Sequence, residues 1–165
     1  MTPPIDPARL VGDYLCTVDF HVGGICALGA SPWGERRVGY ITGGSFAGPR
    51  LNGTVLPGGG NWSGAGRIDA GNVGTFDARA ILRTEDGALI YMTYSGRTLI
   101  SDAVRSAFTD PDPAVRDVDP DDYYLRIAPV FETAAPQYDW LNATLAIGRG
   151  QRTETGARHH LFAVA

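Results

Sequence analysis

Residues 36–62, RRVGYITGGSFAGPRLNGTVLPGGGNW, show most directly how this chain folds. Two runs within this stretch, residues 36–46 and 50–56, have the composition of β-strands, and a short Ala-Gly-Pro segment joins them. Glycines recur inside both runs, although a strand interior normally carries side chains that pack. Because glycine accepts positive φ and close backbone approach, these glycines predict bulged or sharply coiled strands. We therefore expect this stretch to bend a sheet and to close it.

Strand-like runs continue on both sides of this stretch. They lie at residues 10–20, 22–29, 74–83, 88–96, 123–133, 138–150 and 158–165. The dipeptide Asp86-Gly87 is a strong hairpin signal, and Gly23-Gly24 is expected to break the second run. Many short strands with almost no helical periodicity predict an all-β protein. We expect a single-domain antiparallel β-barrel of the calycin or lipocalin type, since closure removes exposed strand edges.

A length of 165 residues favours one domain with one core, assigned here to residues 10–165. The Pro-rich residues 1–9 are expected to lie across the surface of that domain. Residues 101–122 differ from their surroundings because they are acidic and Pro-punctuated, with a helical turn expected near residues 113–116. This excursion either reaches over the barrel mouth or is a plain surface loop, and the loop is the favoured interpretation.

Composition excludes several classes of function. A net charge of -4 and a pI near 5.2 argue against nucleic acid as a partner, because such binding depends on clustered cations. The chain has no lysine, which excludes Schiff-base chemistry and attachment of pyridoxal phosphate. No apolar run has the length that a bilayer requires, and no secretory leader is evident. We expect a cytoplasmic protein with no membrane partner.

The histidines do not indicate a metal site. His159 and His160 are neighbours on an expected strand and should point in opposite directions, and no third ligand has a suitable spacing. We therefore expect neither a metal ion nor any other cofactor.

Several segments, in order, resemble the domain-of-unknown-function 3237 family of small bacterial and fungal proteins. The segments are residues 34–62, 75–97, 123–133 and 138–142. The resemblance covers nearly all of the chain from Leu10 onward. It implies a single-domain antiparallel β-barrel, often seen as a small oligomer, with largely unassigned activity. The family tends to carry alanine and aspartate where this chain has Gly60 and Asn61, so a role that needs the charge of that aspartate would be lost here.

Candidate catalytic residues come from strand alternation. In residues 74–83, Asp77 and Arg79 share one face. If that face points into the barrel, Arg79 could hold an oxyanion while Asp77 moves a proton; otherwise the two form a structural ion pair at the rim. Glu132 follows an apolar run and could be carried inward, where burial would raise its pKa, or could form a structural network with Arg126.

Candidate substrate-binding residues are mostly aromatic. In the expected strand at 138–150, alternation places Tyr138, Trp140 and Asn142 on one face, either as a pocket wall or as an aromatic core layer. Trp62 and Tyr94 either complete the pocket or belong to the core. Of the adjacent Arg36 and Arg37 only one can face inward, and Arg37 is the one assigned to substrate binding.

The favoured function is a cofactor-independent small-molecule enzyme with its site inside the barrel. It would be an isomerase, hydratase or lyase that acts by proton transfer on an aromatic or polyketide-like carbonyl compound. Asp77 or Glu132 would move the proton, and Arg79 and Asn142 would stabilise the enolate-like charge.

Two other functions remain open. The protein could be a non-enzymatic carrier or sensor of a small hydrophobic ligand, since barrels of this size can hold one. It could instead be an interaction module in which an apolar outer strand face forms a homodimer or a higher homo-oligomer.

Overall fold

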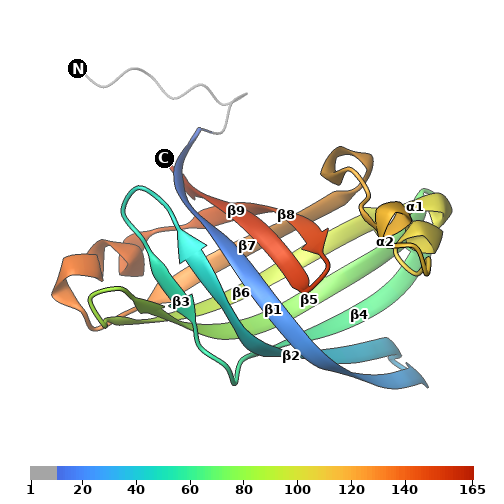
Figure 1. Cartoon of the computed structure of the whole chain (residues 1–165), viewed down its shortest axis with the longest axis horizontal. Helices are drawn as coiled ribbons and strands as arrows, with labels where there is room; N and C mark the ends of the chain where they lie inside the picture. Colours follow the sequence, from blue (N-terminus) through green and yellow to red (C-terminus); the bar gives the residue numbers. More distant parts are fainter. Residues whose placement is uncertain (1–10) are drawn as a thin grey trace.

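The computed structural model describes residues 11–165 and shows one antiparallel sheet that closes into a barrel (Figure 1). The strands of this part are β1 (Gly12–Ser31), β2 (Gly34–Ala47), β3 (Gly53–Val55), β4 (Gly60–Ile68), β5 (Gly71–Thr84), β6 (Leu89–Ile100), β7 (Tyr124–Glu132), β8 (Ala146–Thr153) and β9 (Gly156–Val164). The order is β1-β9-β8-β7-β6-β5-β3-β2-β4, and further pairing of β1 with β2 and of β5 with β4 completes the ring. The predicted all-β barrel is confirmed. The surface segment predicted at residues 1–9 lies outside the described residues.

The glycine-rich stretch closes the barrel as predicted. Residues 36–62 form most of β2, all of β3 and the start of β4. Gly44 has a φ of 144°, and a side chain there would collide with the carbonyl oxygen of Asp19 on β1. Gly53 has a φ of 159°, and a side chain there would collide with the carbonyl oxygen of Arg83 on β5. Glycine therefore lets β2 and β3 cross close to their neighbours at the bend.

Two predictions about turns had different outcomes. The hairpin at Asp86-Gly87 is confirmed, with Gly87 at a φ of 89° between β5 and β6. The predicted break at Gly23-Gly24 is wrong, because β1 continues to Ser31. Its register against β2 shifts between Gly23 and Ile25, so Gly24, at a φ of 62°, is the additional residue of a β-bulge.

The strand predicted at residues 138–150 is also wrong in its first half. Residues 136–143 form a 3-10 helix, η2 (Pro136–Ala143), and strand β8 begins only at Ala146. Pro136 at the helix start suits this conformation, and the amide of Tyr138 donates to the carbonyl of Ala135 over 3.0 Å. Fully buried Leu141 anchors the helix in the core. Local turn chemistry and this single anchor outweigh the strand-like composition.

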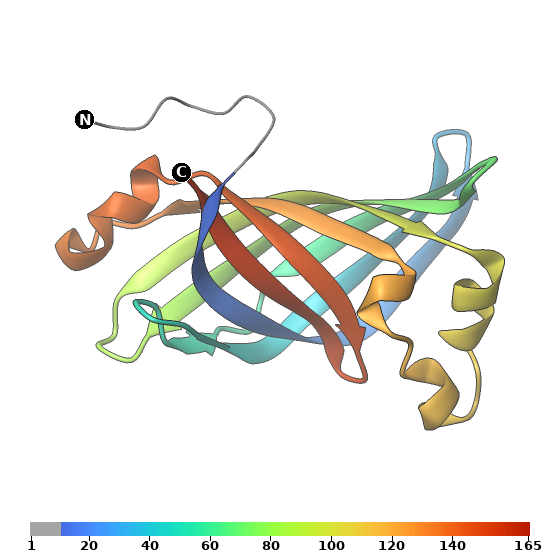
Figure 2. The same cartoon turned by 90° about the horizontal axis from the view of Figure 1, so that it is seen from above.

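The excursion at 101–122 contains α1 (Asp102–Ala107), α2 (Pro113–Arg116) and the 3-10 helix η1 (Pro120–Asp122). Figure 2 shows these helices at one end of the barrel and η2 at the other. Val104 and Tyr123 are buried in the main core cluster, and the Phe108 ring meets the Tyr123 ring edge-on at 5.2 Å. The predicted turn near 113–116 is confirmed. The favoured plain surface loop is wrong, since the excursion packs over part of the barrel end.

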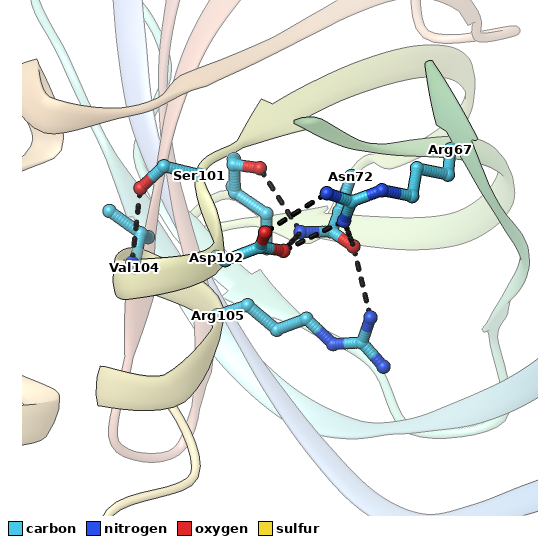
Figure 3. A network of polar contacts seen from close by, with 7 residues as sticks. Arg67, Asn72, Ser101, Asp102, Val104 and Arg105 are labelled. Carbon is cyan, nitrogen blue, oxygen red and sulfur yellow. Dashed lines mark hydrogen bonds and ion pairs between the residues drawn. The ribbon is translucent and has the colours of Figure 1, made fainter. Parts of the chain in front are cut away.

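A polar network ties α1 to the β4–β5 turn (Figure 3). Arg67 donates two hydrogen bonds, of 2.8 and 2.9 Å, to the two carboxylate oxygens of Asp102. The buried side chain of Asn72 donates to Asp102 over 2.9 Å and accepts from Arg105 over 2.9 Å. These bonds, those from Arg67 first, hold the pKa of Asp102 well below its usual range. The network therefore fixes the start of the excursion to the barrel rim.

The two ends of the barrel interior are filled to different degrees. At the η2 end, Ile90, Met92 and Leu141 are fully buried in an apolar core. On β2, exposure rises toward the α1 end along the inward-facing residues, from 3% at Ile41 to the exposed Arg37. The same trend appears along the inward face of β4; on β5 the inward-facing Gly74 and Phe76 are half-buried, and Asn72 at the strand start is buried. The interior is thus packed at the η2 end and reached by solvent at the α1 end.

Candidate functional site

Three aromatic side chains form a layer across the middle of the barrel. Phe20 of β1, Tyr94 of β6 and His159 of β9 are all buried, at 2%, 7% and 3% exposure. Their ring centroids lie 5.9 Å apart for Phe20 and Tyr94, 6.0 Å for Phe20 and His159, and 5.7 Å for Tyr94 and His159. Because β7 and β8 separate β6 from β9 in the ring of strands, Tyr94 reaches across the interior. From this layer toward the α1 end, inward-facing residues become more exposed, from half-buried Phe76 to exposed Arg37.

His159 is the most unusual member of the layer. Its Nδ1 atom is buried and has no hydrogen-bond partner in the described part of the chain, although buried polar atoms are normally paired. The ring lies over Gly150 of β8, where a side chain would collide with it. Burial, with a smaller contribution from His160, lowers the pKa of His159 to about 4. The imidazole is therefore neutral near pH 7.

Half-buried Asn61 of β4 carries the second buried polar atom that has no partner among the described residues. Its Oδ1 accepts no hydrogen bond from residues 11–165. Asn61 lies opposite Ala78, which lies opposite Tyr94, so the three form one inward-facing row across β4, β5 and β6. Adjacent strands are about 4.8 Å apart, which puts the backbones of Asn61 and Tyr94 about 10 Å apart. Burial raises the pKa of the Tyr94 hydroxyl, so this group is a neutral donor near pH 7.

This arrangement offers a neutral imidazole, a phenol hydroxyl and an amide within a largely apolar interior. A ligand hydroxyl could donate a hydrogen bond to Oδ1 of Asn61 or to the neutral imidazole, and a ligand carbonyl could accept one from the Tyr94 hydroxyl. The rings of Phe20 and Tyr94 would contact the apolar part of the ligand. Among residues 11–165, no group of three or more His, Cys, Asp and Glu side chains could hold a metal ion. No helix in the same part is long and apolar enough to cross a membrane.

The sequence-based candidates on β5 lie outside the barrel. Asp77 and Arg79 form an ion pair of 3.2 Å with exposed side chains, while Ala78 and Ala80 between and beside them are buried inside. The Arg79 guanidinium is 5.7 Å from the ring of Trp62, which is therefore on the outer face too. The interpretation that places Asp77 and Arg79 inside the barrel is wrong, and the alternative of a structural ion pair holds, since the inward positions of this strand are taken by Ala78 and Ala80.

Glu132 and Asn142 do not converge with that pair. Glu132 is exposed at the end of β7, and the buried side chain beside it is Phe131. The Asn142 carboxamide is also exposed and brackets Thr133, accepting from its amide over 2.8 Å and donating to its carbonyl over 3.0 Å. The expected inward Glu132 is therefore wrong, and Asn142 satisfies backbone groups, which was the alternative interpretation of that residue.

The aromatic residues of η2 do not line the interior site either. The Tyr138 hydroxyl donates to Asp86 over 3.2 Å, and the Trp140 ring lies 3.8 Å from the guanidinium carbon of Arg50. Both contacts lie at the η2 end, away from the α1 end. The predicted shared strand face of Tyr138, Trp140 and Asn142 is wrong because these residues belong to a helix.

Tyr94 and Arg37 are the sequence-based candidates that the structure places on the inner face of the barrel. Sequence reasoning missed His159 because the residue was weighed only as a metal ligand. Strand alternation did place His159 and His160 on opposite faces, and His160 does face outward, with its Nδ1 2.7 Å from the hydroxyl oxygen of Thr17. The position of Asn61 was noted only as a departure from the resembled family.

A separate hollow lies on the outer face where β7 and β8 part. These strands share only the pairs Arg126 with Arg149 and Ile127 with Gly148. The open hollow has a volume of about 490 Å³, and Arg97, Tyr124 and Ile147 are among its lining residues. Its lining contains no carboxylate, histidine or thiol, so the interior site has more side chains suited to proton transfer.

Known proteins are similar to this chain in both sequence and fold. The family model "Protein of unknown function (DUF3237)" matches residues 11–164. A UPF0311 protein of Rhodopseudomonas palustris is 30% identical over 152 residues, which are 92% of each chain. A β-barrel-like protein of Acinetobacter baumannii has 31% identity and a TM-score of 0.78 over 98% of this chain and 100% of its own. A protein of Penicillium herquei described as an enzyme shares the fold, with 21% identity and a TM-score of 0.66 over 99% of this chain and 100% of its own.

Proposed function

Since this chain belongs to the DUF3237 family of proteins of unknown function, we propose its activity from the interior site itself. The barrel binds a small, largely apolar carbonyl compound and catalyses proton transfer on it without a cofactor. The reaction class is isomerisation, hydration or elimination. The observation that supports this most directly is the buried imidazole of His159, which contacts Tyr94 and whose Nδ1 has no partner among residues 11–165.

The proposed chemistry assigns one step to each polar side chain. His159, neutral near pH 7, takes a proton from the carbon next to the ligand carbonyl. The Tyr94 hydroxyl and the Asn61 amide donate hydrogen bonds to the carbonyl oxygen as negative charge develops on it. The protonated imidazole then returns its proton, either to another carbon of the enolate or to a departing hydroxyl group. Every proton taken is returned, so the cycle balances.

The aromatic layer would position the ligand. Phe20 and Tyr94 provide ring faces, and the apolar core beneath them excludes water from the reacting carbon. The low pKa of His159 makes the imidazole a weak base in the empty barrel, but makes its protonated form a strong acid for the return step.

The test follows exchange of carbon-bound protons in deuterium oxide. A panel of cyclic ketones and diketones is incubated with the protein, and loss of the α-proton signals is followed by NMR. We expect exchange that His159→Gln abolishes and Tyr94→Phe slows by about 100-fold, the effect of losing an oxyanion donor. Glu132→Gln, on the outer face, is the control and should leave exchange unchanged.

Two outcomes would contradict the proposal. Exchange that survives in His159→Gln would remove the proposed base. Binding of ring compounds without exchange of any of them would favour the second function, a carrier, for which the aromatic layer of Phe20, Tyr94 and His159 suffices.

A further inference from the structure

One arginine at the α1 end of the interior, Arg152, has no acidic partner among the described residues. Arg152 of β8 follows the buried, inward-facing Gly148 and Gly150 by strand alternation. Its guanidinium carbon lies 4.8 Å from the centroid of the Phe108 ring, and its amide donates to the Tyr123 hydroxyl over 2.9 Å. Among residues 11–165, none of the ion pairs involves Arg152.

Two other arginines lie near Arg152. Arg116 of α2 is held by the carbonyls of Asp110 and Pro111, at 2.8 and 2.9 Å. Arg37 is on the inward face of β2, with Glu35 as its partner at 2.9 Å. Desolvation lowers the pKa of Arg152 most, Tyr123 opposes it with the next largest effect, and the charges of Arg116 and Arg37 add smaller decreases. A bound anion would offset both the desolvation and the repulsion from these two arginines.

The distance to the aromatic layer suits one molecule. Arg152 is two residues beyond Gly150, whose backbone faces the His159 ring. Two residues of strand span about 7 Å, roughly the length of one or two fused rings. A ring compound in contact with His159 would therefore present a terminal group to Arg152.

We propose that Arg152, supported by Arg37 and Arg116, binds an anionic oxygen group of the ligand at the α1 end of the barrel. This inference rests on the proposed interior site and specifies its ligand class: an apolar ring compound with a carboxylate or phosphate about 7 Å from the carbon that reacts. A planar guanidinium binds either anion through paired hydrogen bonds.

The experiment compares a neutral and two anionic ligands that share a naphthalene ring and differ in the polar group attached to it. The neutral fluorescent probe N-phenyl-1-naphthylamine is bound to the protein and then displaced by 2-acetylnaphthalene, 2-naphthoate or 2-naphthyl phosphate. Either anion should displace the probe at about tenfold lower concentration than the neutral ketone, which is the scale of one charge-assisted contact. The stronger of the two anions identifies the group that the site prefers.

Variants then assign the effect to Arg152. Arg152→Gln should remove the preference for the anion while leaving displacement by 2-acetylnaphthalene within about twofold, and Arg152→Lys should keep part of the preference. Arg36→Gln removes the same charge from the outward-facing neighbour of Arg37, so it should change neither ligand. The thermal midpoint of each variant checks that the fold persists.

The outcomes separate this inference from the proposed function. If the probe and the neutral ketone bind but anions gain nothing, the arginine site is wrong and the interior site stands. If Arg152→Gln and Arg36→Gln weaken anion binding equally, only net charge is acting and the inference also fails. If neither the probe nor the ketone binds, the interior site itself is wrong.

Discussion

The imidazole of His159 occupies the space above Gly150 that a side chain on β8 would otherwise fill. A methyl group added to Gly150 would come within 2.5 Å of Nδ1 of His159 and would collide with Leu125. The His159 ring can therefore adopt this position only because residue 150 on the neighbouring strand has no side chain.

Gly150→Ala should displace His159 or Leu125 and reduce the free energy of unfolding by about 1–3 kcal/mol, the usual cost of overpacking. Gly66→Ala on β4 is the matched control, because its new methyl group would make only an ordinary 3.6 Å contact with Val73. Chemical denaturation of both variants measures the difference. If the two variants had the same free energy of unfolding, a methyl group at position 150 would fit without strain, contrary to this prediction.

Stability should depend on pH through His159. Its pKa is about 4 in the folded protein and near 6.5 in the unfolded chain, so protonation favours unfolding. The free energy of unfolding should be unaffected by this group above about pH 6.5 and decrease between about pH 6.5 and 4, by on the order of 3 kcal/mol.

The same measurement on His159→Gln should lack this decrease, and His160→Gln should retain it because His160 faces outward. Parallel pH profiles for the wild-type protein and His159→Gln, from denaturation at each pH, would contradict the assignment.

Asn72→Ala should loosen the excursion from the barrel rim. The substitution removes the buried amide that joins Asp102 to Arg105, so both exposed side chains lose a hydrogen bond to the rim while the Arg67–Asp102 pair remains. Hydrogen exchange of the α1 amides should accelerate, whereas Asp117→Asn in the same excursion should have no such effect. Unchanged exchange in α1 would mean that apolar contacts of Val104 alone hold the helix.

Asp77→Asn and Arg79→Gln should leave both probe binding and proton exchange intact. Their ion pair is exposed on the outer face, where such pairs contribute about 0–1 kcal/mol. Denaturation and N-phenyl-1-naphthylamine titration of the two variants check this. A loss of ligand binding in either would restore the sequence-based site on β5.

The fold was predictable because it depends on local patterns. The glycines of residues 36–62 and the Asp86-Gly87 dipeptide favour bent and turned backbone whatever surrounds them. In the structure the glycines bend the sheet and Asp86-Gly87 forms the hairpin turn, as predicted. The bulge at Gly24 was missed because glycine pairs inside strands signal bulges and breaks alike.

The candidate site was less predictable because alternation assigns residues to two faces without saying which is inside. On β5 the face with Ala78 and Ala80 is buried, although Asp77 and Arg79 carry more chemistry. In η2 a proline start and one buried leucine decide the structure, and the strand-like composition of residues 138–145 contains no sign of this. The unpaired state of His159 and Asn61 depends on several strands at once, which no local pattern records.

The two ends of the barrel differ in how much stability a substitution costs. Replacing Ile90 or Met92 with alanine at the packed end would cost about 2–5 kcal/mol, a large fraction of the roughly 5–15 kcal/mol by which a domain is stable, so substitution there is constrained. Exposed Arg37 and Arg152 at the other end can change at a cost near 0.5 kcal/mol. Descendants of this chain could therefore acquire new ligand preferences by exchanging mouth residues, without first acquiring stabilising mutations.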